Sequence, residues 1–269
     1  MTLNAFPGSA HAANFNPGTA AQLQSDLATA AANGENDTIT LNASIYSTTD
    51  NGNASFLYTS IENNSLTITG AGAGASILDG GGLAGGPTVL AISTTGADAA
   101  IQISGVTIRN ANTASIGGLV VSNVNGAIDV QSSEILDNTS TGSTGGLNLI
   151  SVGGPVTFND NTVRGNLGNA DGGGRISTPG GSVTLNNNTI SENTATVFQG
   201  GLIVAGASGG ATADGNTVSG NNGNFDGGLT LVVDGDLIVT NNTFSDNTGT
   251  IFNGGLNGAS NLGSARIEG

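Results

Sequence analysis

The sequence predicts an all-β chain wound as a single-stranded right-handed parallel β-helix, a solenoid with 27–28 residues per coil and a short N-terminal capping helix. A double glycine recurs between Gly117 and Gly255, and the first glycines are 28, 28, 27, 27 and 27 residues apart. Each interval holds short β-branched runs in which apolar and polar residues alternate. A fixed period of this size is typical of an array whose repeats pack only on their neighbours.

The strands of such an array are expected to be parallel. Three short strands in each interval leave the rest of the coil as the crossover that parallel strands need, and crossovers of this kind are right-handed. The competing fold is a β-propeller, but its blades need about 40 or more residues each. The period therefore favours the β-helix.

The composition is rich in glycine and strongly acidic. The 269 residues include 46 Gly, no Cys, and 19 Asp or Glu against 4 basic residues, all of them Arg, for a net charge of −15. This charge argues against nucleic acid or anionic membranes as partners, and leaves cations, glycans or protein surfaces. Without Cys there are no disulfides or thiolate metal sites. No apolar run reaches transmembrane length, so we expect no membrane insertion.

Residues 1–42 are expected to form an irregular leader, the capping helix and a first strand. Thr19 can cap a helix that stops at Asn33-Gly34, and a strand follows over 37–42. That helix would cover the open end of the stack. Its helically spaced apolar residues are Ala20, Leu23, Leu27 and Ala30 or Ala31.

The leader also bears on export. Ala10-His11-Ala12 is similar to a signal-peptidase site, but the residues before it are neither basic nor apolar enough for a signal peptide. No signal peptide is visible in this chain, so export would use another route or an upstream part that the chain lacks.

Residues 43–116 are expected to be irregular early coils, continuous in one domain with the regular coils of 117–269. Residues 43–64 form a polar insertion that contains Tyr46, Phe56 and Tyr58. From Gly117 onward, each coil has a strand after the double glycine, an alternating second strand, and an apolar residue followed by a closing Asn. The closing residues are Asn110, Asn138, Asn166, Asn193, Asn221 and Asn247.

Stacked coils place equivalent residues above each other, about 4.8 Å apart. One predicted column is an asparagine ladder with Ser133 beneath it, which would satisfy buried turn amides. A second column is aromatic and is expected to pack in the core or a turn, unless its rings point outward as a sugar-stacking platform. The double glycine is explained by positive φ and close approach at a corner. The two columns are Asn161, Asn188, Asn216 and Asn242, and Phe198, Phe225 and Phe252.

One coil breaks the pattern and supplies the candidate site. Asp171-Gly-Gly-Gly174-Arg175 carries an extra glycine, and Arg175 falls where other coils have Leu, which suggests a one-residue bulge that turns Arg175 outward. Arg164, Asp171 and Arg175 form a possible ligand site, with a solvated edge as the alternative. No cofactor is expected, although calcium is possible in acidic turns at Asp171 and Asp226.

The repeated Gly-Gly-Leu, the alternating strand and Phe244-Ser-Asp-Asn247 resemble bacterial right-handed β-helix repeat proteins of the polymorphic outer-membrane protein and autotransporter-passenger type. The openings Leu66-Thr-Ile-Thr-Gly70 and Ile77-Leu-Asp-Gly80 are similar to the first coils of such proteins. This resemblance implies a protein of the cell surface or the extracellular space with an adhesive or structural role. We expect the chain to lack the membrane-barrel domain that anchors proteins of that family.

The alternative function is a polysaccharide-binding protein, or a lyase or hydrolase that cleaves a polysaccharide. Lyases of this fold usually use a basic residue and calcium, yet the chain has no Lys. Asp129, Asp160 and Asp214 are scattered singly where a hydrolase needs two opposed carboxylates, and His11 lies in the leader. We therefore expect no catalytic residues and no enzyme activity.

The last coil suggests assembly. Ala265 and Ile267 fit the second-strand column, and the sequence stops before the coil is closed. An uncovered stack end is a template for another chain. We therefore expect end-to-end association into a homopolymeric filament, through the first residues of the next subunit, unless the chain is a fragment of a longer array. A surface protein or glycan is the other expected partner.

Overall fold

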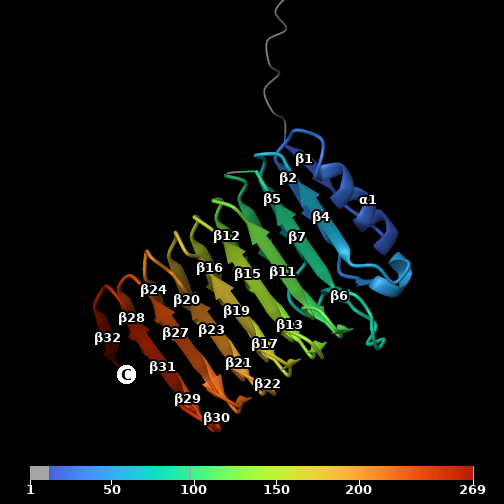
Figure 1. Ribbon diagram of the computed structural model, residues 1–269. Helices are drawn as coiled ribbons and strands as arrows, with labels where there is room; N and C mark the ends of the chain where they lie inside the picture. The colour runs from blue at the N-terminus through green and yellow to red at the C-terminus, as the bar shows by residue number, and fades with distance from the viewer. Residues whose placement is uncertain (1–11, 97, 269) are drawn as a thin grey trace, which may run out of the picture.

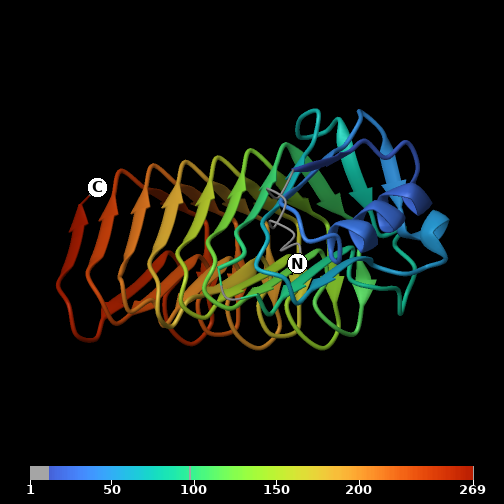
Figure 2. The same ribbon diagram turned by 90° about the horizontal axis from the view of Figure 1, so that it is seen from above.

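The structure is a computed structural model that describes residues 12–96 and 98–268. These residues form a parallel β-helix of about nine turns, as predicted (Figure 1). Figure 2 shows the coils stacked along one axis, with helix α1 (Ala20–Ala30) at the end where the described chain begins. Residues 1–11 of the predicted leader, including His11, lie outside the described residues.

The described residues form four parallel sheets, which each regular coil visits in the order A, B, D and C. Sheet A contains β1 (Ala13–Phe15), β2 (Asp37–Thr40), β5 (Leu66–Thr69), β8 (Ile101–Ser104), β12 (Ile128–Gln131), β16 (Val156–Asn159), β20 (Val183–Asn186), β24 (Ala211–Asp214), β28 (Leu237–Thr240) and β32 (Ala265–Glu268). Sheet B contains β3 (Ile45–Ser47), β6 (Ser76–Asp79), β9 (Val106–Arg109), β13 (Glu134–Leu136), β17 (Thr162–Arg164), β21 (Thr189–Ser191), β25 (Thr217–Ser219) and β29 (Thr243–Ser245).

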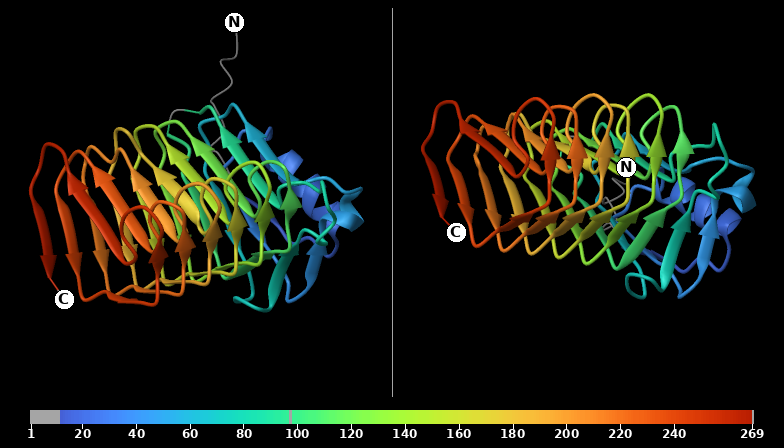
Figure 3. Two further views of the ribbon diagram at one scale, coloured as in Figure 1. Left: turned by 60° about the horizontal axis from the view of Figure 1, so that its bottom comes forward. Right: turned by 90° about the horizontal axis from the view of Figure 1, so that it is seen from below.

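The other two sheets complete the coil (Figure 3). Sheet C contains β4 (Phe56–Ser60), β7 (Leu90–Thr94), β11 (Leu119–Asn123), β15 (Leu147–Ser151), β19 (Gly174–Ser177), β23 (Leu202–Ala205), β27 (Leu229–Val233) and β31 (Leu256–Ser260). Sheet D contains β10 (Asn112–Thr113), β14 (Thr139–Ser140), β18 (Leu167–Gly168), β22 (Thr194–Ala195), β26 (Asn222–Gly223) and β30 (Thr248–Gly249). The prediction of three strands per coil is therefore wrong, because the two-residue strands of sheet D are too short to show an alternating pattern.

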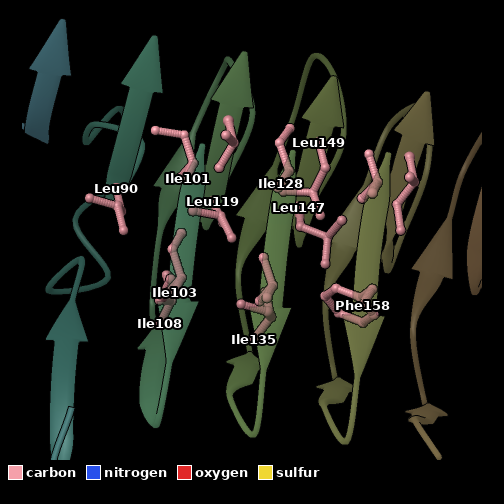
Figure 4. Packing of buried hydrophobic residues seen from close by; sticks show 14 of the residues in the cluster. Leu90, Ile101, Ile103, Ile108, Leu119, Ile128, Ile135, Leu147, Leu149 and Phe158 are labelled. Atoms are coloured by element: carbon pink, nitrogen blue, oxygen red, sulfur yellow. The ribbon is translucent and has the colours of Figure 1, made fainter. Parts of the chain in front are cut away.

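The core lies inside the coil and is continuous along the axis. Inward residues of each strand stack on the same position of the next coil, as Ile128 does on Val156 and Val130 on Phe158. All four are fully buried. Figure 4 shows Ile128 and Phe158 among the buried side chains of neighbouring coils that point into the core. Each coil thus completes the core of the one before it, which is why such an array needs several repeats.

Two ladders, buried except at their last members, run along the sharp turns of the coils. The predicted ladder, which begins at Ser133 and continues through Asn161, Asn188, Asn216 and Asn242, lies between sheets A and B, and its first bond joins the Ser133 N–H to Asn161 Oδ1 at 3.0 Å. The second lies between sheets B and D and consists of Asn138, Asn166, Asn193, Asn221 and Asn247. Residues just before ladder positions often have positive φ, such as Asp137 at 53° and Glu192 at 57°.

Asn110, predicted to close its coil, is displaced from the second ladder by one residue. It takes the positive-φ position, at 58°, and Ala111 stands at the ladder position, where its N–H donates to Asn138 Oδ1. The Asn110 side chain instead donates to Asp79. The ladder therefore begins at Asn138.

The double glycines lie against the second ladder. A Cβ at Gly118 would come within 2.7 Å of both Asn138 Nδ2 and the Gly146 carbonyl oxygen. Gly117 and Gly118 are not among the described glycines with positive φ. Close approach of neighbouring coils therefore explains the pair, and the expected positive φ is wrong.

The first coils are more regular than predicted. Helix α1 forms as expected, with Thr19 Oγ1 accepting from the Gln22 N–H at 3.2 Å, and it packs its apolar face on the end of the core. The supposed insertion at 43–64 contributes β3, β4 and the 3-10 helix η1 (Thr48–Asn51). Tyr46, Phe56 and Tyr58 are fully buried, and Tyr46 donates its hydroxyl to the Pro17 carbonyl at 2.8 Å. These large side chains fill the space under α1.

Candidate functional site: an apolar ridge and the hollow beside it

The predicted ligand site at Arg164, Asp171 and Arg175 is split by the fold. Arg175 Nε lies 3.1 Å from Asp171 Oδ2, and only 1% of the Asp171 side chain is exposed. Arg164 is on sheet B and faces Glu192 of the next coil at 3.7 Å, with both side chains exposed. The structure therefore brings Asp171 and Arg175 together and leaves Arg164 with another partner.

The extra glycine beside this pair is not a bulge. Gly174 pairs with Leu147 and Leu202 on the neighbouring strands, so it occupies the leucine position itself, and Arg175 pairs with Asn148 and Ile203. Arg175 points outward as predicted, because it follows the inward position that Gly174 occupies. No residue is inserted in the strand. A Cβ at Gly174 would lie 2.6 Å from Leu147 Cγ, which means that Leu147 leans into the space of the missing side chain.

The two acids considered for calcium are both buried in the turn that precedes the double glycine. Burial raises the pKa of Asp171 above its ordinary value, and the Arg175 guanidinium opposes that rise. Asp226 accepts hydrogen bonds from the Thr230 hydroxyl and the Asn257 amide, both at 3.0 Å. Within the described residues no group of three His, Asp or Glu side chains is placed to hold a metal ion. Calcium binding stays a prediction, with these two carboxylates bound to protein donors.

The carboxylates considered for hydrolysis lie on and beside the outer face of sheet A. Asp129 and Asp214 belong to strands three positions apart in the sheet, about 14 Å along the axis at a strand spacing of about 4.8 Å. Glycosidases hold their two carboxyl groups about 5 to 9.5 Å apart. Hydrogen bonds from Thr240 and Asn241 lower the pKa of Asp214, which favours its ionised form. The separation of Asp129 and Asp214 therefore exceeds the range for a catalytic pair.

The phenylalanine column stands on the outside of the molecule. The centroids of the Phe198 and Phe225 rings are 5.5 Å apart, and their planes are tilted by 53°. The centroids of the Phe225 and Phe252 rings are 5.4 Å apart, with a tilt of 51°. Phe198 is 40% exposed and Phe252 is 61% exposed. Of the two expected places, the core is therefore wrong, and the column packs at the turn between sheets D and C. The rings partly cover one another and present the rest of their surface to solvent.

Neighbouring residues extend this column into an apolar ridge, which we define as Val197, Phe198, Phe225, Ile251 and Phe252. Val197 and Ile251 are themselves exposed. The three segments that carry the ridge are 194–199, 221–226 and 248–253, and their only charged residue is the buried Asp226. In a chain of net charge −15, this strip of three coils presents no exposed charge.

A hollow of about 240 Å³ lies on sheet D, at β14 and β18, and is called the hollow below. Leu167, 40% exposed, supplies its apolar floor, and Thr196 directly precedes the ridge residues Val197 and Phe198. The lining is uncharged throughout and consists of Thr139, Ser140, Thr141, Leu167, Gly168, Asn169 and Thr196. Sequence analysis missed the hollow, since none of these residues repeats in a pattern.

A larger hollow of about 440 Å³ is lined by the last three described loops from sheet C to sheet A. Its acids are engaged with the next coil: Asp236 accepts from the Ser264 N–H at 2.8 Å, and Asp234 from the Asn261 amide at 2.9 Å. Leu262, at 86% exposure, stands at its edge. The carboxylates of Asp234 and Asp236 therefore hold the loop of the next coil in place.

The last described coil leaves part of the core uncovered. Ala265 and Ile267 pair with Leu237 and Val239, so they do continue the inward column of sheet A. Ile267 is nevertheless 54% exposed, and Leu256 on sheet C is only partly buried.

Comparisons of the chain with protein-family models, with curated proteins and with solved structures give no match. Among residues 12–96 and 98–268 there is no helix long and apolar enough to cross a membrane.

Proposed function

We propose that this chain is an extracellular or cell-surface β-helix protein of the autotransporter-passenger type, with an adhesive and structural role. The observation that carries the proposal is the apolar ridge, because large side chains are kept on the outside where they add nothing to the core. Apolar patches rimmed by polar residues on soluble proteins commonly mark sites of contact with another surface. A stack of identical coils suits this role, since it holds the ridge in a fixed line.

Charge supports the same proposal. A chain of net charge −15 repels other acidic surfaces at long range. The ridge has no exposed charge of its own, so a partner can approach there without desolvating a carboxylate. Adhesion through the ridge would therefore be apolar in character and only weakly sensitive to salt.

Retention of the purified chain on immobilised glycans, extracellular-matrix proteins and whole cells tests this function. The double variant Phe198→Ser/Phe252→Ser should lose most of the retention, because it removes the two most exposed rings of the ridge. Val152→Ser is the matched control, since Val152 is 53% exposed on a different turn. Equal retention of the double variant, the control and the unmodified chain would reject the ridge as an adhesive surface.

End-to-end association into a filament is a second candidate function, favoured by the exposed inward side chains of the last described coil. Ile267 and Leu256 would be buried by another coil, and β31 and β32 each have one edge free among the described strands. The first residues, expected to receive this end, include the eleven that the structure does not describe. Further coils of a longer chain would cover the same side chains.

Sedimentation velocity over a hundredfold concentration range, with electron micrographs, tests association. Filaments that disappear in Ile267→Asp, with the secondary structure unchanged, are the expected result. Monomers at every concentration would reject the filament.

A further inference from the structure

We propose that the apolar ridge binds the ridge of a second copy of this chain, and that the two solenoids lie antiparallel about a two-fold axis through Asn224. This inference rests on the proposed role of the ridge as a contact surface, and it names the partner that the ridge fits.

The ridge has the same pattern when its three coils are read in either direction. Each coil contributes one phenylalanine, and the backbone N–H of each later one donates to the carbonyl of the one before it, at 3.1 Å. The residue that precedes the ring is aliphatic in the outer two coils and an amide in the middle one. These residues are Val197, Asn224 and Ile251, followed by Phe198, Phe225 and Phe252. The middle coil is therefore the centre of a symmetric surface.

A symmetric surface of this kind is complementary to itself. In a two-fold contact, residue i of one copy meets residue j of the other, and j meets i. An axis that crosses the ridge at the middle coil places Val197 opposite Ile251 of the second copy, and Phe198 opposite Phe252. Both pairs are apolar on both sides. The rings are 5.5 and 5.4 Å apart along the ridge, and a partner with the same spacing meets every one of them.

Asn224 decides the orientation of the pair. Its side chain is partly buried, its amide nitrogen reaches the Val197 carbonyl only at 3.4 Å, and its Oδ1 accepts no hydrogen bond among the described residues. In the antiparallel pair the two Asn224 amides meet at the axis, where each can donate to the Oδ1 of the other. A two-fold axis along the solenoid would instead make the copies parallel and place Asn224 against a phenylalanine ring, where the amide loses water without gaining a partner. The antiparallel pair is therefore favoured.

The surroundings of the ridge are also uncharged. Segments 194–205, 221–233 and 248–260 run from sheet D across the ridge into sheet C, and their only charged residue is the buried Asp226. Two copies of net charge −15 repel one another at long range, but at the ridge they touch without bringing carboxylates together. Added salt screens the repulsion and leaves the apolar contact intact. Dimerisation should therefore strengthen with salt.

The exposed area of the ridge limits the strength of the pair. The exposed fractions are 36% for Val197, 40% for Phe198, 53% for Ile251 and 61% for Phe252. Taking about 200 Å² for each side chain, the ridge can bury on the order of 400 Å² per copy. A specific, stable interface buries about 800 Å² on each partner, so we expect a weak and reversible dimer.

Sedimentation velocity of the full chain tests the pair, from about 1 to about 500 µM and at about 0.05 and about 0.5 M NaCl. We expect a step from monomer to dimer, with a smaller dissociation constant at the higher salt. Asn224→Asp should raise the dissociation constant about tenfold or more, because the axis brings the two new carboxylates together. Asn53→Asp is the matched control, which adds the same charge on an exposed turn outside the ridge and should leave the dimer unchanged.

Single cysteines test the position of the axis, since the chain has no cysteine of its own. Asn224→Cys should give a disulfide-linked dimer under mild oxidation, because the two introduced side chains meet at the axis. Val197→Cys is its control, since the two copies of that position lie two coils apart. That distance of about 9.6 Å exceeds the span of about 4.4–6.8 Å between the Cα atoms of a disulfide. The double variant Val197→Cys/Ile251→Cys should restore the link.

The proposal is overturned if the chain stays monomeric at about 500 µM in both salts, if salt dissociates the dimer, or if Asn224→Asp and Asn53→Asp dimerise equally. A dimer in which Asn224→Cys does not cross-link overturns it as well, because the contact then lies elsewhere. Monomers whose adhesion is lost in Phe198→Ser/Phe252→Ser would reject the second copy and keep the adhesive function. Dimers that are retained on no immobilised surface or cell would reject the adhesive function alone.

Discussion

Replacing Asn193 by Ala tests how much the second asparagine ladder contributes to stability. The Asn193 side chain is fully buried and takes part in four hydrogen bonds. Its Nδ2 donates to the Val163 carbonyl of the preceding coil and to Asn221 Oδ1 of the next, both at 2.9 Å. Its Oδ1 accepts from the N–H and the Nδ2 of Asn166, at 3.0 and 2.9 Å.

The expected loss of stability follows from the groups that Asn193→Ala leaves without a hydrogen-bond partner. Asn221 Oδ1 still accepts from the Asn193 N–H, and Asn166 Nδ2 still donates to the Ile135 carbonyl. The Val163 carbonyl and the Asn166 N–H lose their bonds to this side chain, at about 1–3 kcal/mol for each buried group left unsatisfied. The net loss from the two remaining bonds adds about 1 kcal/mol each. We therefore expect a decrease of about 4–8 kcal/mol in the free energy of unfolding, a large share of the usual total.

Urea unfolding followed by circular dichroism measures this decrease, together with hydrogen exchange in the coils on either side. Asn222→Ala is the matched control, because Asn222 is an exposed asparagine of sheet D whose side chain makes no hydrogen bond among the described residues, and it should change stability by less than about 0.5 kcal/mol. A loss below about 1 kcal/mol for Asn193→Ala would refute the reasoning. It would mean that water or a shifted turn satisfies both groups.

Three further predictions concern single side chains. Burial raises the folded-state pKa of Asp171, so the folded chain releases this proton at higher pH than the unfolded chain. Stability therefore falls as the pH rises above the ordinary pKa of an aspartate. Asp171→Asn should remove this fall, seen as a flatter plot of unfolding free energy against pH from about 3 to 7. Glu192→Gly should stabilise the chain by about 0.5–1 kcal/mol, since a φ of 57° is unfavourable for Glu and its exposed pair with Arg164 contributes little; an unchanged urea midpoint would contradict this. Gly118→Ala should destabilise by about 1–3 kcal/mol through overpacking, whereas Gly18→Ala, whose nearest neighbour would be 3.7 Å away, should leave the thermal midpoint within about 2 °C.

The repeated features of the chain could be predicted from the sequence because each occurs in several coils. The glycine period, the asparagine ladder of Asn161 and the inward column of Ile128 each answer a physical requirement that recurs once in every coil. Helix α1 was also predictable, since its cap at Thr19 and its apolar spacing are local signals.

Features that occur once, or that depend on what lies outside the coil, were not predictable. Tyr46 and Phe56 lie in a segment without the period. Their burial follows from the pairing of β3 with β6 and of β4 with β7, and from the packing of α1 on that end of the core. The phenylalanine column repeats as regularly as the asparagines, yet repetition alone does not say whether a column faces inward. Gly174 is the last of three adjacent glycines, and the strand register decides which two of them correspond to the double glycine of the other coils. The hollow is lined by residues of three successive coils, which a search for repetition does not single out.

The nearly constant length of the coils has a mechanical consequence. Each regular coil contains 27 or 28 residues and is held to its neighbours by parallel ladders and one asparagine from each turn. When the two ends of the chain are pulled apart, the coils peel off singly, and each released coil lengthens the tether by about 90 Å once extended. The force trace should therefore be a regular sawtooth whose spacing reports the glycine period. Such a rod yields one coil at a time under tension, which would let a surface protein dissipate a sudden load without unfolding completely.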